Sequence, residues 1–192
     1  MRLDRDLVSR HTVKFLPRRY VRVTPMVHAA SPLGMGFGDT RFASPSRSFK
    51  LLYIAKNLAT GVAETIVRDR FEGSGIRELM LTEITSWGAT EVSALSALSL
   101  LDLRGSACVA LGVSTDIKGA KGQDEARKFS DAIHNQTDVD GILYHSRLTG
   151  KPCAAIYERS AGSKLSATPV IELARLAELI NVLKALNILL IR

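Results

Sequence analysis

The sequence predicts an α+β fold in a single domain, for three reasons. Apolar runs typical of strands outnumber helical patterns and do not alternate regularly with them, which argues against a doubly wound sheet. The 192 residues can build one hydrophobic core but not two comfortable ones. Hydrophobic residues make up 46% of the chain and charged residues 23%, as in ordinary globular proteins. We therefore expect one compact domain over residues 1–192, with mixed central sheets flanked by helices.

The N-terminal part of the chain is basic and leads into the first predicted strand. Its basic side chains are Arg2, Arg5, Arg10, Lys14, Arg18, Arg19 and Arg22. Such a run occurs in nucleic-acid-binding arms, but this one contains no DNA-reading motif. We therefore interpret residues 1–19 as a solvated segment in front of the domain. Residues 20–23 alternate like a short strand.

A glycine-rich loop follows at residues 34–38. It reads G-x-G-x-G, and Asp39 occupies the position of the third glycine in the dinucleotide-binding fingerprint G-x-G-x-x-G. No strand precedes it and no helix follows at once, so the sequence excludes a Rossmann phosphate loop. A bound nucleotide would have to be held by side chains and a shaped loop.

The centre of the sequence places a tyrosine on a strand and a glutamate on the helix after it. Apolar residues between turn formers predict a buried strand at residues 51–55, which carries Tyr53. Asn57 is a suitable N-cap, and the apolar spacing beyond it puts Glu64 near the middle of a helix. Two interpretations of Glu64 stay open. It forms an ion pair with Arg68 at i,i+4, worth about 0.3–0.5 kcal/mol, or it is a functional carboxylate.

Apolar periodicity and turn residues predict the elements of the second half. We expect strands at residues 76–84, 100–103, 142–144, 154–157 and 188–191. We expect helices at residues 92–98, 123–134 and 170–186. Turns at residues 87–88 and 140–141 and a loop at residues 110–122 separate these elements. The strand at 142–144 places Ser146 at its end, next to a loop.

Charge and hydropathy limit the partners and the location of the protein. The net charge of +7 and a pI near 9.7 imply an anionic partner, which is a nucleic acid, a phosphorylated small molecule or an acidic protein. The first residues lack the apolar core of a signal peptide, and charges interrupt the apolar C-terminal run. We expect a cytoplasmic protein with no membrane contact. Cys108 and Cys153 lie far apart and are expected to be reduced, buried thiols.

Two common kinds of active site do not fit the sequence. His145 and Ser146 are adjacent on a predicted strand, so their side chains point to opposite faces and cannot easily pair as base and nucleophile. The histidines and cysteines show no metal-ligand spacing, so we expect no metal site. The remaining polar candidates are arginine, tyrosine, glutamate and serine side chains.

These residue types suit cleavage of an N-glycosidic bond to a positively charged leaving group, as in NAD. Nicotinamide leaves as a neutral molecule and needs little acid catalysis, whereas the oxocarbenium-like ribose needs a nearby carboxylate. Arginines bind a pyrophosphate through forked hydrogen bonds, and a tyrosine face can stack on the nicotinamide. A serine hydroxyl can fix a ribose or amide group.

At these residues the sequence resembles the RES family, the toxins of Xre-RES toxin-antitoxin pairs. The matching pieces are Tyr20 to Val23, Arg41-Phe42 with Ser44-Pro45, Leu51 to Ala55, Ala63-Glu64, and Asp140 to Arg147. Glu64 lies eleven residues after Tyr53. Each piece is short, but their order is fairly specific, and with a weaker C-terminal match the likeness spans residues 20–191.

The resemblance implies a fold similar to that of the ADP-ribosyltransferases and an activity that consumes NAD as substrate, without a metal. By this resemblance Arg22 and Arg41 contact the NAD phosphates and Tyr53 the nicotinamide end. Glu64 contacts the ribose, and Ser146 the nicotinamide or ribose hydroxyls. The expected catalytic residues are Glu64, Arg41 and Ser146, and the expected NAD-binding residues are Arg22, Arg41, Tyr53 and Ser146. The resemblance also implies a cognate Xre-type antitoxin that occludes the site.

The acceptor of the ADP-ribose stays open. Water or phosphate as acceptor makes the protein an NAD glycohydrolase or phosphorylase, and a protein acceptor makes it a mono-ADP-ribosyltransferase. A further alternative is a basic nucleic-acid-binding module without enzymatic activity. The N-terminal arginines have no interleaved aromatic residues, so we expect no direct nucleic-acid binding. The positive charge also suits docking of an acidic antitoxin.

Overall fold

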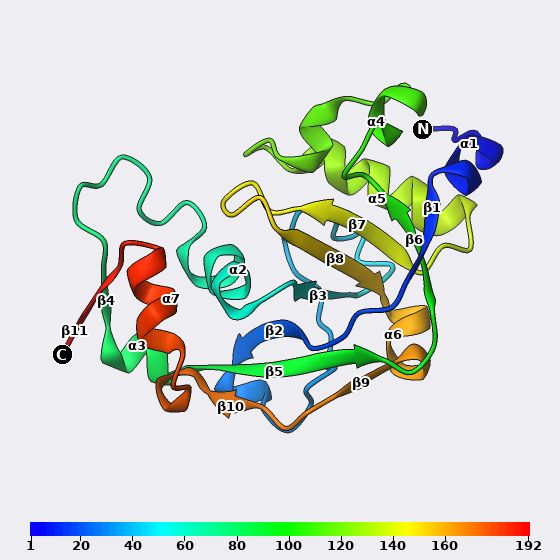
Figure 1. The fold of residues 1–192 in the computed structure, drawn as a ribbon. Helices are drawn as coiled ribbons and strands as arrows, with labels where there is room; N and C mark the ends of the chain where they lie inside the picture. Colours follow the sequence, from blue (N-terminus) through cyan, green and yellow to red (C-terminus); the bar gives the residue numbers. More distant parts are fainter.

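The computed structural model describes residues 1–192 and has a long curled sheet at its centre (Figure 1). Its strands are β1 (Thr12–Phe15), β2 (Tyr20–Pro25), β3 (Leu51–Ala55), β5 (Trp87–Ala94), β6 (Leu98–Asp102), β7 (Gly141–His145), β8 (Pro152–Tyr157), β9 (Leu165–Ala167) and β10 (Ile171–Glu172). A separate pair consists of β4 (Glu78–Met80) and β11 (Leu189–Ile191). The α-helices are α1 (Arg5–Arg10), α2 (Leu58–Val62), α3 (Leu81–Thr85), α4 (Ala107–Ala110), α5 (Asp124–Gln136), α6 (Glu158–Lys164) and α7 (Leu179–Ala185).

The sheet is mixed, and it opens at one place. Its strand order is β1-β6-β7-β8-β3-β2-β5-β10, with β9 also on β5, and only β6 and β7 run parallel. β3 pairs with β8 along its whole length, and β2 pairs with β5 in the same way. Between β2 and β3, however, the pairing is limited to Val21 and Ala55. The sheet therefore consists of two well-paired halves that part between β2 and β3. The first half contains β1, β6, β7, β8 and β3, and the second contains β2, β5, β9 and β10. This is the predicted α+β class.

Three clusters of buried residues hold the two halves and their helices together. One packs Phe129 of α5 against strands of the first half, such as Ile142 of β7. A second packs Val62 of α2 and Leu183 of α7 against β2 and β5. The third lies between strands of both halves. Figure 1 shows the two helix groups apart, α4 and α5 near the N-terminus and α3 and α7 near the C-terminus.

Several predicted elements are confirmed. The strand at residues 51–55 and the closing strand, the helix near 123–134, and the strands around 142–144 and 154–157 are all present, with bounds within a few residues. Asn57 caps α2, because its side chain accepts a hydrogen bond from the Thr60 amide at 3.0 Å. Local capping and apolar runs suffice for these elements.

The stretch from 76 to 98 was predicted wrongly in three places. Only Glu78–Met80 is a strand, and α3 (Leu81–Thr85) follows it because Glu83 accepts from the Met80 amide and caps the helix. Residues 87–88 are not a turn but begin β5. Gly88 is needed there, since a Cβ would lie 2.5 Å from Val170. Residues 92–94 belong to β5 rather than to a helix, because β9 pairs with all three and β2 pairs with Val92.

The ends of the chain also differ from expectation. Residues 1–19 are not merely a solvated segment, because they form α1, capped by Asp4, and β1, which pairs with β6. The helix expected at 170–186 is divided into β10, a 3-10 turn η4 (Leu173–Arg175) and α7. Pairing of Ile171 with Ala89 draws the first part into the sheet. None of the helices is long and apolar enough to cross a membrane.

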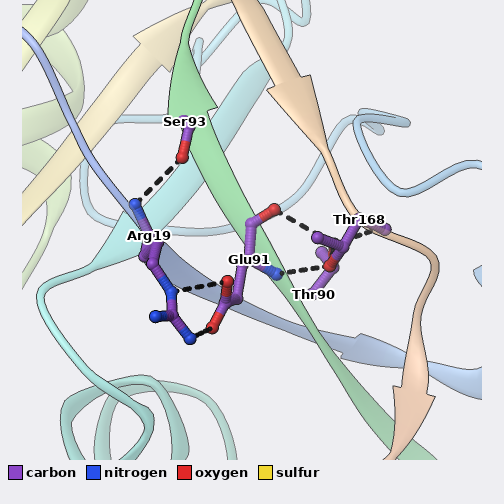
Figure 2. A network of polar contacts seen from close by, with 5 residues as sticks. All are labelled: Arg19, Thr90, Glu91, Ser93 and Thr168. Carbon is purple, nitrogen blue, oxygen red and sulfur yellow. Dashed lines mark hydrogen bonds and ion pairs between the residues drawn. The ribbon is translucent and has the colours of Figure 1, made fainter.

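A polar network joins Thr168, which follows β9, to β5 in the second half of the sheet (Figure 2). Glu91 of β5 donates its amide hydrogen to the Thr168 hydroxyl at 3.0 Å and accepts from the Thr168 amide at 3.0 Å. On the other side, the Arg19 guanidinium makes two hydrogen bonds to the Glu91 carboxylate, at 2.8 and 2.9 Å. Arg19 is exposed, so this pair contributes little to stability. One arginine of the basic N-terminal run is therefore used within the fold.

A buried carboxylate, Asp140, links the parallel strands β6 and β7 to α6. Asp140, 5% exposed, accepts hydrogen bonds from the Ser99 amide and the Lys164 ammonium, each at 2.7 Å, and from the Ser160 hydroxyl. Burial opposes its ionisation, but these donors together lower the pKa of Asp140. The next residue, Gly141, lies so close to β8 that a Cβ would be 2.2 Å from the Ala155 carbonyl oxygen. The Asp-Gly pair therefore fixes the start of β7.

Candidate active site

Glu64 lies where the helix after β3 widens. α2 passes directly into η2 (Ala63–Val67), a π-helical turn, and Glu64 is its second residue. The turn ends at Arg68, whose backbone has φ 37°. Non-glycine residues rarely adopt this conformation, and π-helical turns occur often at functional sites. The sequence signals for a helix were correct here, but they did not indicate its widened end.

The serine directly after β7 holds the Glu64 carboxylate. The Ser146 hydroxyl donates to Glu64 Oε1 at 2.5 Å and accepts from the amides of Leu148 and Thr149, each at 3.1 Å. The two amides orient the hydroxyl, so its hydrogen points at the carboxylate. Short bonds to an ionised acceptor are roughly twice as strong as neutral ones. Glu64 therefore uses Ser146 as its partner, and no ion pair joins it to Arg68.

Ser146 itself is 2% exposed, whereas the neighbouring His145 is exposed. The two side chains thus differ in exposure, as expected for neighbours that point to opposite faces. Ser146 is placed to position Glu64. Its contact with the nicotinamide or ribose hydroxyls stays a prediction.

The opening between β2 and β3 forms a cavity of about 520 Å³. Its lining includes four of the five predicted site residues, Arg22, Arg41, Tyr53 and Glu64. The strands that contribute are β7, β8, β3, β2 and β5, which are neighbours in this order. The volume of the cavity lies in the range of small-molecule sites.

Positive charge predominates around this cavity. Its charged lining residues are the arginines Arg22, Arg41, Arg68 and Arg147 and the carboxylates Glu64 and Asp69. Arg147 and Asp69 form an ion pair with each other. The remaining arginines have no carboxylate partner within ion-pair distance. This field favours an anionic ligand.

The two arginines singled out from the sequence are each held by a backbone carbonyl. Arg22 Nη1 donates to Pro32 at 3.0 Å, and Arg41 Nη1 donates to Ala120 at 2.7 Å. Burial lowers the pKa of Arg22 to about 10 and also lowers the pKa of Arg41. Both arginines stay charged at neutral pH. Each keeps guanidinium hydrogens free for an anion such as a phosphate.

Tyr53 fixes the loop that carries Arg41. Its hydroxyl oxygen accepts from the Thr40 hydroxyl at 2.9 Å and from the Phe42 amide at 3.1 Å. Burial raises the pKa of Tyr53, so the phenol stays neutral at physiological pH. Its hydroxyl holds the residues on both sides of Arg41, and the tyrosine itself lines the cavity. The position of Arg41 therefore depends on Tyr53.

Three aromatic residues of the cavity were not predicted from the sequence: Phe37, Trp87 and Tyr144. Tyr144 lies two residues before Ser146 on β7, so strand alternation could have placed it on the same face. Trp87 was missed because it was assigned to a turn. Phe37 belongs to an irregular loop whose glycines do not match the dinucleotide-binding fingerprint.

The two cysteines are reduced and buried, as predicted. Cys153 of β8 lines the cavity, and burial raises the pKa of its thiol to about 12. The thiol is therefore protonated and a poor nucleophile at neutral pH. No three side chains among the histidines, cysteines and carboxylates gather as metal ligands.

Comparison with known proteins gives one family match and a similar solved structure. A family model described as the RES domain matches residues 16–175. Among solved structures, the chain is similar to a chain of the M. tuberculosis MbcT-MbcA toxin-antitoxin complex. That match has a TM-score of 0.65 and 16% sequence identity, and covers 88% of this chain and 92% of the other. At this identity the likeness concerns the fold. No curated protein matches the chain.

The family match includes all five residues singled out from the sequence, together with the strands and the helix that carry them. This protein belongs to the RES-domain family.

Proposed function

We propose that this protein is the toxin of a toxin-antitoxin pair, and that it consumes NAD by cleaving the bond between nicotinamide and ribose. Its RES domain and its structural likeness to a chain of a toxin-antitoxin complex support the first part. One observation carries the second part. The Glu64 carboxylate, held by Ser146, lies in an arginine-rich cavity of a size suited to a small anionic ligand.

The proposed reaction breaks the bond between the ribose C1′ and the nicotinamide nitrogen. The bonding electron pair goes to the pyridinium ring, so nicotinamide leaves as a neutral molecule and needs no proton. Positive charge then develops on the ribose ring. The Glu64 carboxylate would stabilise this charge, as carboxylates do in glycoside hydrolysis. Its hydrogen bond from Ser146 keeps it in one orientation before the reaction begins.

The other cavity residues suit the remaining parts of NAD. Arg22 and Arg41 are charged and have no carboxylate partner, so they can bind the pyrophosphate. Tyr53 lines the cavity and would contact the nicotinamide end. No metal enters this scheme, because the leaving group is already activated by its own charge.

The acceptor of the ADP-ribose distinguishes two forms of this proposal. Attack by water gives ADP-ribose and a proton, and attack by phosphate gives a phosphorylated ADP-ribose. Transfer to a side chain of a cellular protein would instead make the protein a mono-ADP-ribosyltransferase. The net charge of +7 supports a third element, an acidic partner protein that binds as antitoxin and covers the cavity.

The decisive experiment follows nicotinamide release from NAD by the purified chain, with and without phosphate. We expect Glu64→Gln to lower the rate at least about 100-fold, because it removes the charge but keeps the shape. The matched control is Glu125→Gln, since Glu125 is exposed on α5 and lies outside the cavity. Equal rates for the Glu64 variant and the wild type would refute the assignment. Phosphate dependence separates phosphorolysis from hydrolysis.

If purified chain releases no nicotinamide, a cell lysate with labelled NAD tests the transferase. Label that appears on a protein only with active Glu64 would support transfer. Absence of both release and labelling would refute the NAD-consuming function.

A further inference from the structure

A phenylalanine stands half exposed at the wall of the cavity. Phe37, 51% exposed, lines it together with Gly36 and Gly38. The Lys50 ammonium lies 5.1 Å from the centre of its ring. This residue is not among those that the sequence pattern or the family resemblance singled out. An apolar ring in this position is available to a ligand in the cavity.

The two glycines beside Phe37 are not required by the packing of the protein. A Cβ built on Gly36 would meet no atom within 4 Å, and one on Gly38 would meet only the Thr40 methyl, at 3.8 Å. Neither glycine has a left-handed backbone. Alanine would fit at both positions, so the glycines do not serve local sterics. They leave this segment backbone freedom and allow another molecule to come close.

A second, smaller cavity of about 90 Å³ also borders this segment. Phe37 and its two glycines line it too, together with Tyr53 and Leu51 of β3. The segment is therefore bordered by two cavities, and atoms do not pack densely around it. The two cavities leave space beside the Phe37 ring.

The segment borders the part of the large cavity that Tyr53 lines. Phe37 and Tyr53 line both cavities, which places them on a shared part of the wall. Tyr53 in turn holds the loop of Arg41, and the charge of Glu64 acts on Arg41. A ligand ring that lies against Tyr53 would thus lie beside the part of the wall that Phe37 forms.

We propose that Phe37 is a substrate-contacting residue, whose ring packs on the nicotinamide ring of the dinucleotide after the 36–38 segment closes over it. The inference rests on the proposed NAD cleavage and assigns the residue that covers the leaving group. Contact between the aromatic ring and the pyridinium strengthens binding through stacking and cation–π attraction.

Steady-state kinetics of nicotinamide release test the role of Phe37. An aromatic side chain that stacks on a ligand ring contributes to binding, and the Phe37 ring is half exposed, so Phe37→Ala should raise KM about 5- to 20-fold, which is about 1–1.8 kcal/mol. We expect kcat to change less than about threefold, since the contact forms before the reaction. Phe37→Tyr keeps the aromatic ring and should have the wild-type KM. The control is Val27→Ala, because Val27 is 85% exposed and lies outside the cavity.

Binding to two ligands tests which ring Phe37 contacts. In the Glu64→Gln background, where turnover is slow, calorimetry compares NAD with ADP-ribose, which lacks nicotinamide. Phe37→Ala should weaken NAD binding about 5- to 20-fold and leave ADP-ribose binding unchanged. Equal weakening of both ligands, or of neither, would overturn the proposal. Melting temperatures equal to that of the parent protein show that each variant is folded.

The outcomes also separate this inference from the proposed function. If the wild type releases nicotinamide and Phe37→Ala has an unchanged KM, the Phe37 inference fails alone. If the wild type neither binds nor cleaves NAD, both fail together.

Discussion

The hydrogen bond from Ser146 to Glu64 offers the sharpest test of how the site works. Removing the hydroxyl in Ser146→Ala leaves the carboxylate without its only side-chain donor, which lies 2.5 Å away. Hydrogen bonds to charged groups contribute about 1.5–3 kcal/mol. If that interaction serves to place the carboxylate for the transition state, kcat should fall about 10- to 150-fold.

A double-mutant cycle decides whether Ser146 acts through Glu64. The assay measures kcat of nicotinamide release for Ser146→Ala, Glu64→Gln and the double variant. In the Gln background the serine has no charge to hold, so we expect the alanine substitution to change kcat less than about threefold. Ser146→Thr keeps a hydroxyl and should recover most of the wild-type kcat.

The cycle also identifies the alternative. An equal loss on removing Ser146 in both backgrounds would refute the positioning role. It would favour direct contact with the nicotinamide or ribose hydroxyls, as the family resemblance implies. Ser146 also accepts from two backbone amides in the turn after β7, so the variant should unfold at a lower temperature. Activity is therefore measured well below that temperature.

Two further predictions concern the support of the site and of the sheet. Tyr53→Phe leaves the Thr40 hydroxyl and the Phe42 amide without their acceptor. We therefore expect the free energy of unfolding in urea to fall by about 1–3 kcal/mol and the KM for NAD to rise. If neither quantity changes, the supporting role of Tyr53 is wrong. The hydrogen-bond partners of Asp140 lower its pKa in the folded protein. Asp140 therefore contributes to stability at pH values above its unfolded-state pKa, near 3.9, and this contribution is lost as the pH falls through its folded-state pKa. Asp140→Asn should therefore lose less stability than the wild type between pH 7 and pH 3; equal acid sensitivity in thermal unfolding would count against the Lys164 and Ser160 bonds.

The elements that sequence reasoning predicted well are those that local chemistry specifies. The strand with Tyr53 follows turn formers and consists of apolar residues, and α2 begins at the Asn57 cap. Ser146 was placed correctly at the end of a strand, facing away from His145. Each of these features depends on neighbours within a few residues.

The errors arose where distant pairing overrides local preference. Residues 92–94 have helical spacing but join β5, because β2 and β9 both offer backbone partners. The stretch from 170 loses its first helical turn to pairing with β5 in the same way. Local patterns carry no information about such partners.

Local patterns predict the α+β class, the residue types of the site and the elements that carry them. They do not predict that these residues meet, which depends on long-range pairing of the strands. Glu64 and Ser146 are 82 positions apart, and they meet because β3 leads into α2 and η2 while β7 lies two strands away. The cavity exists because β2 and β3 pair only at Val21 and Ala55 and then part. That separation follows from the way two half-sheets pack on different helices, which no local pattern encodes.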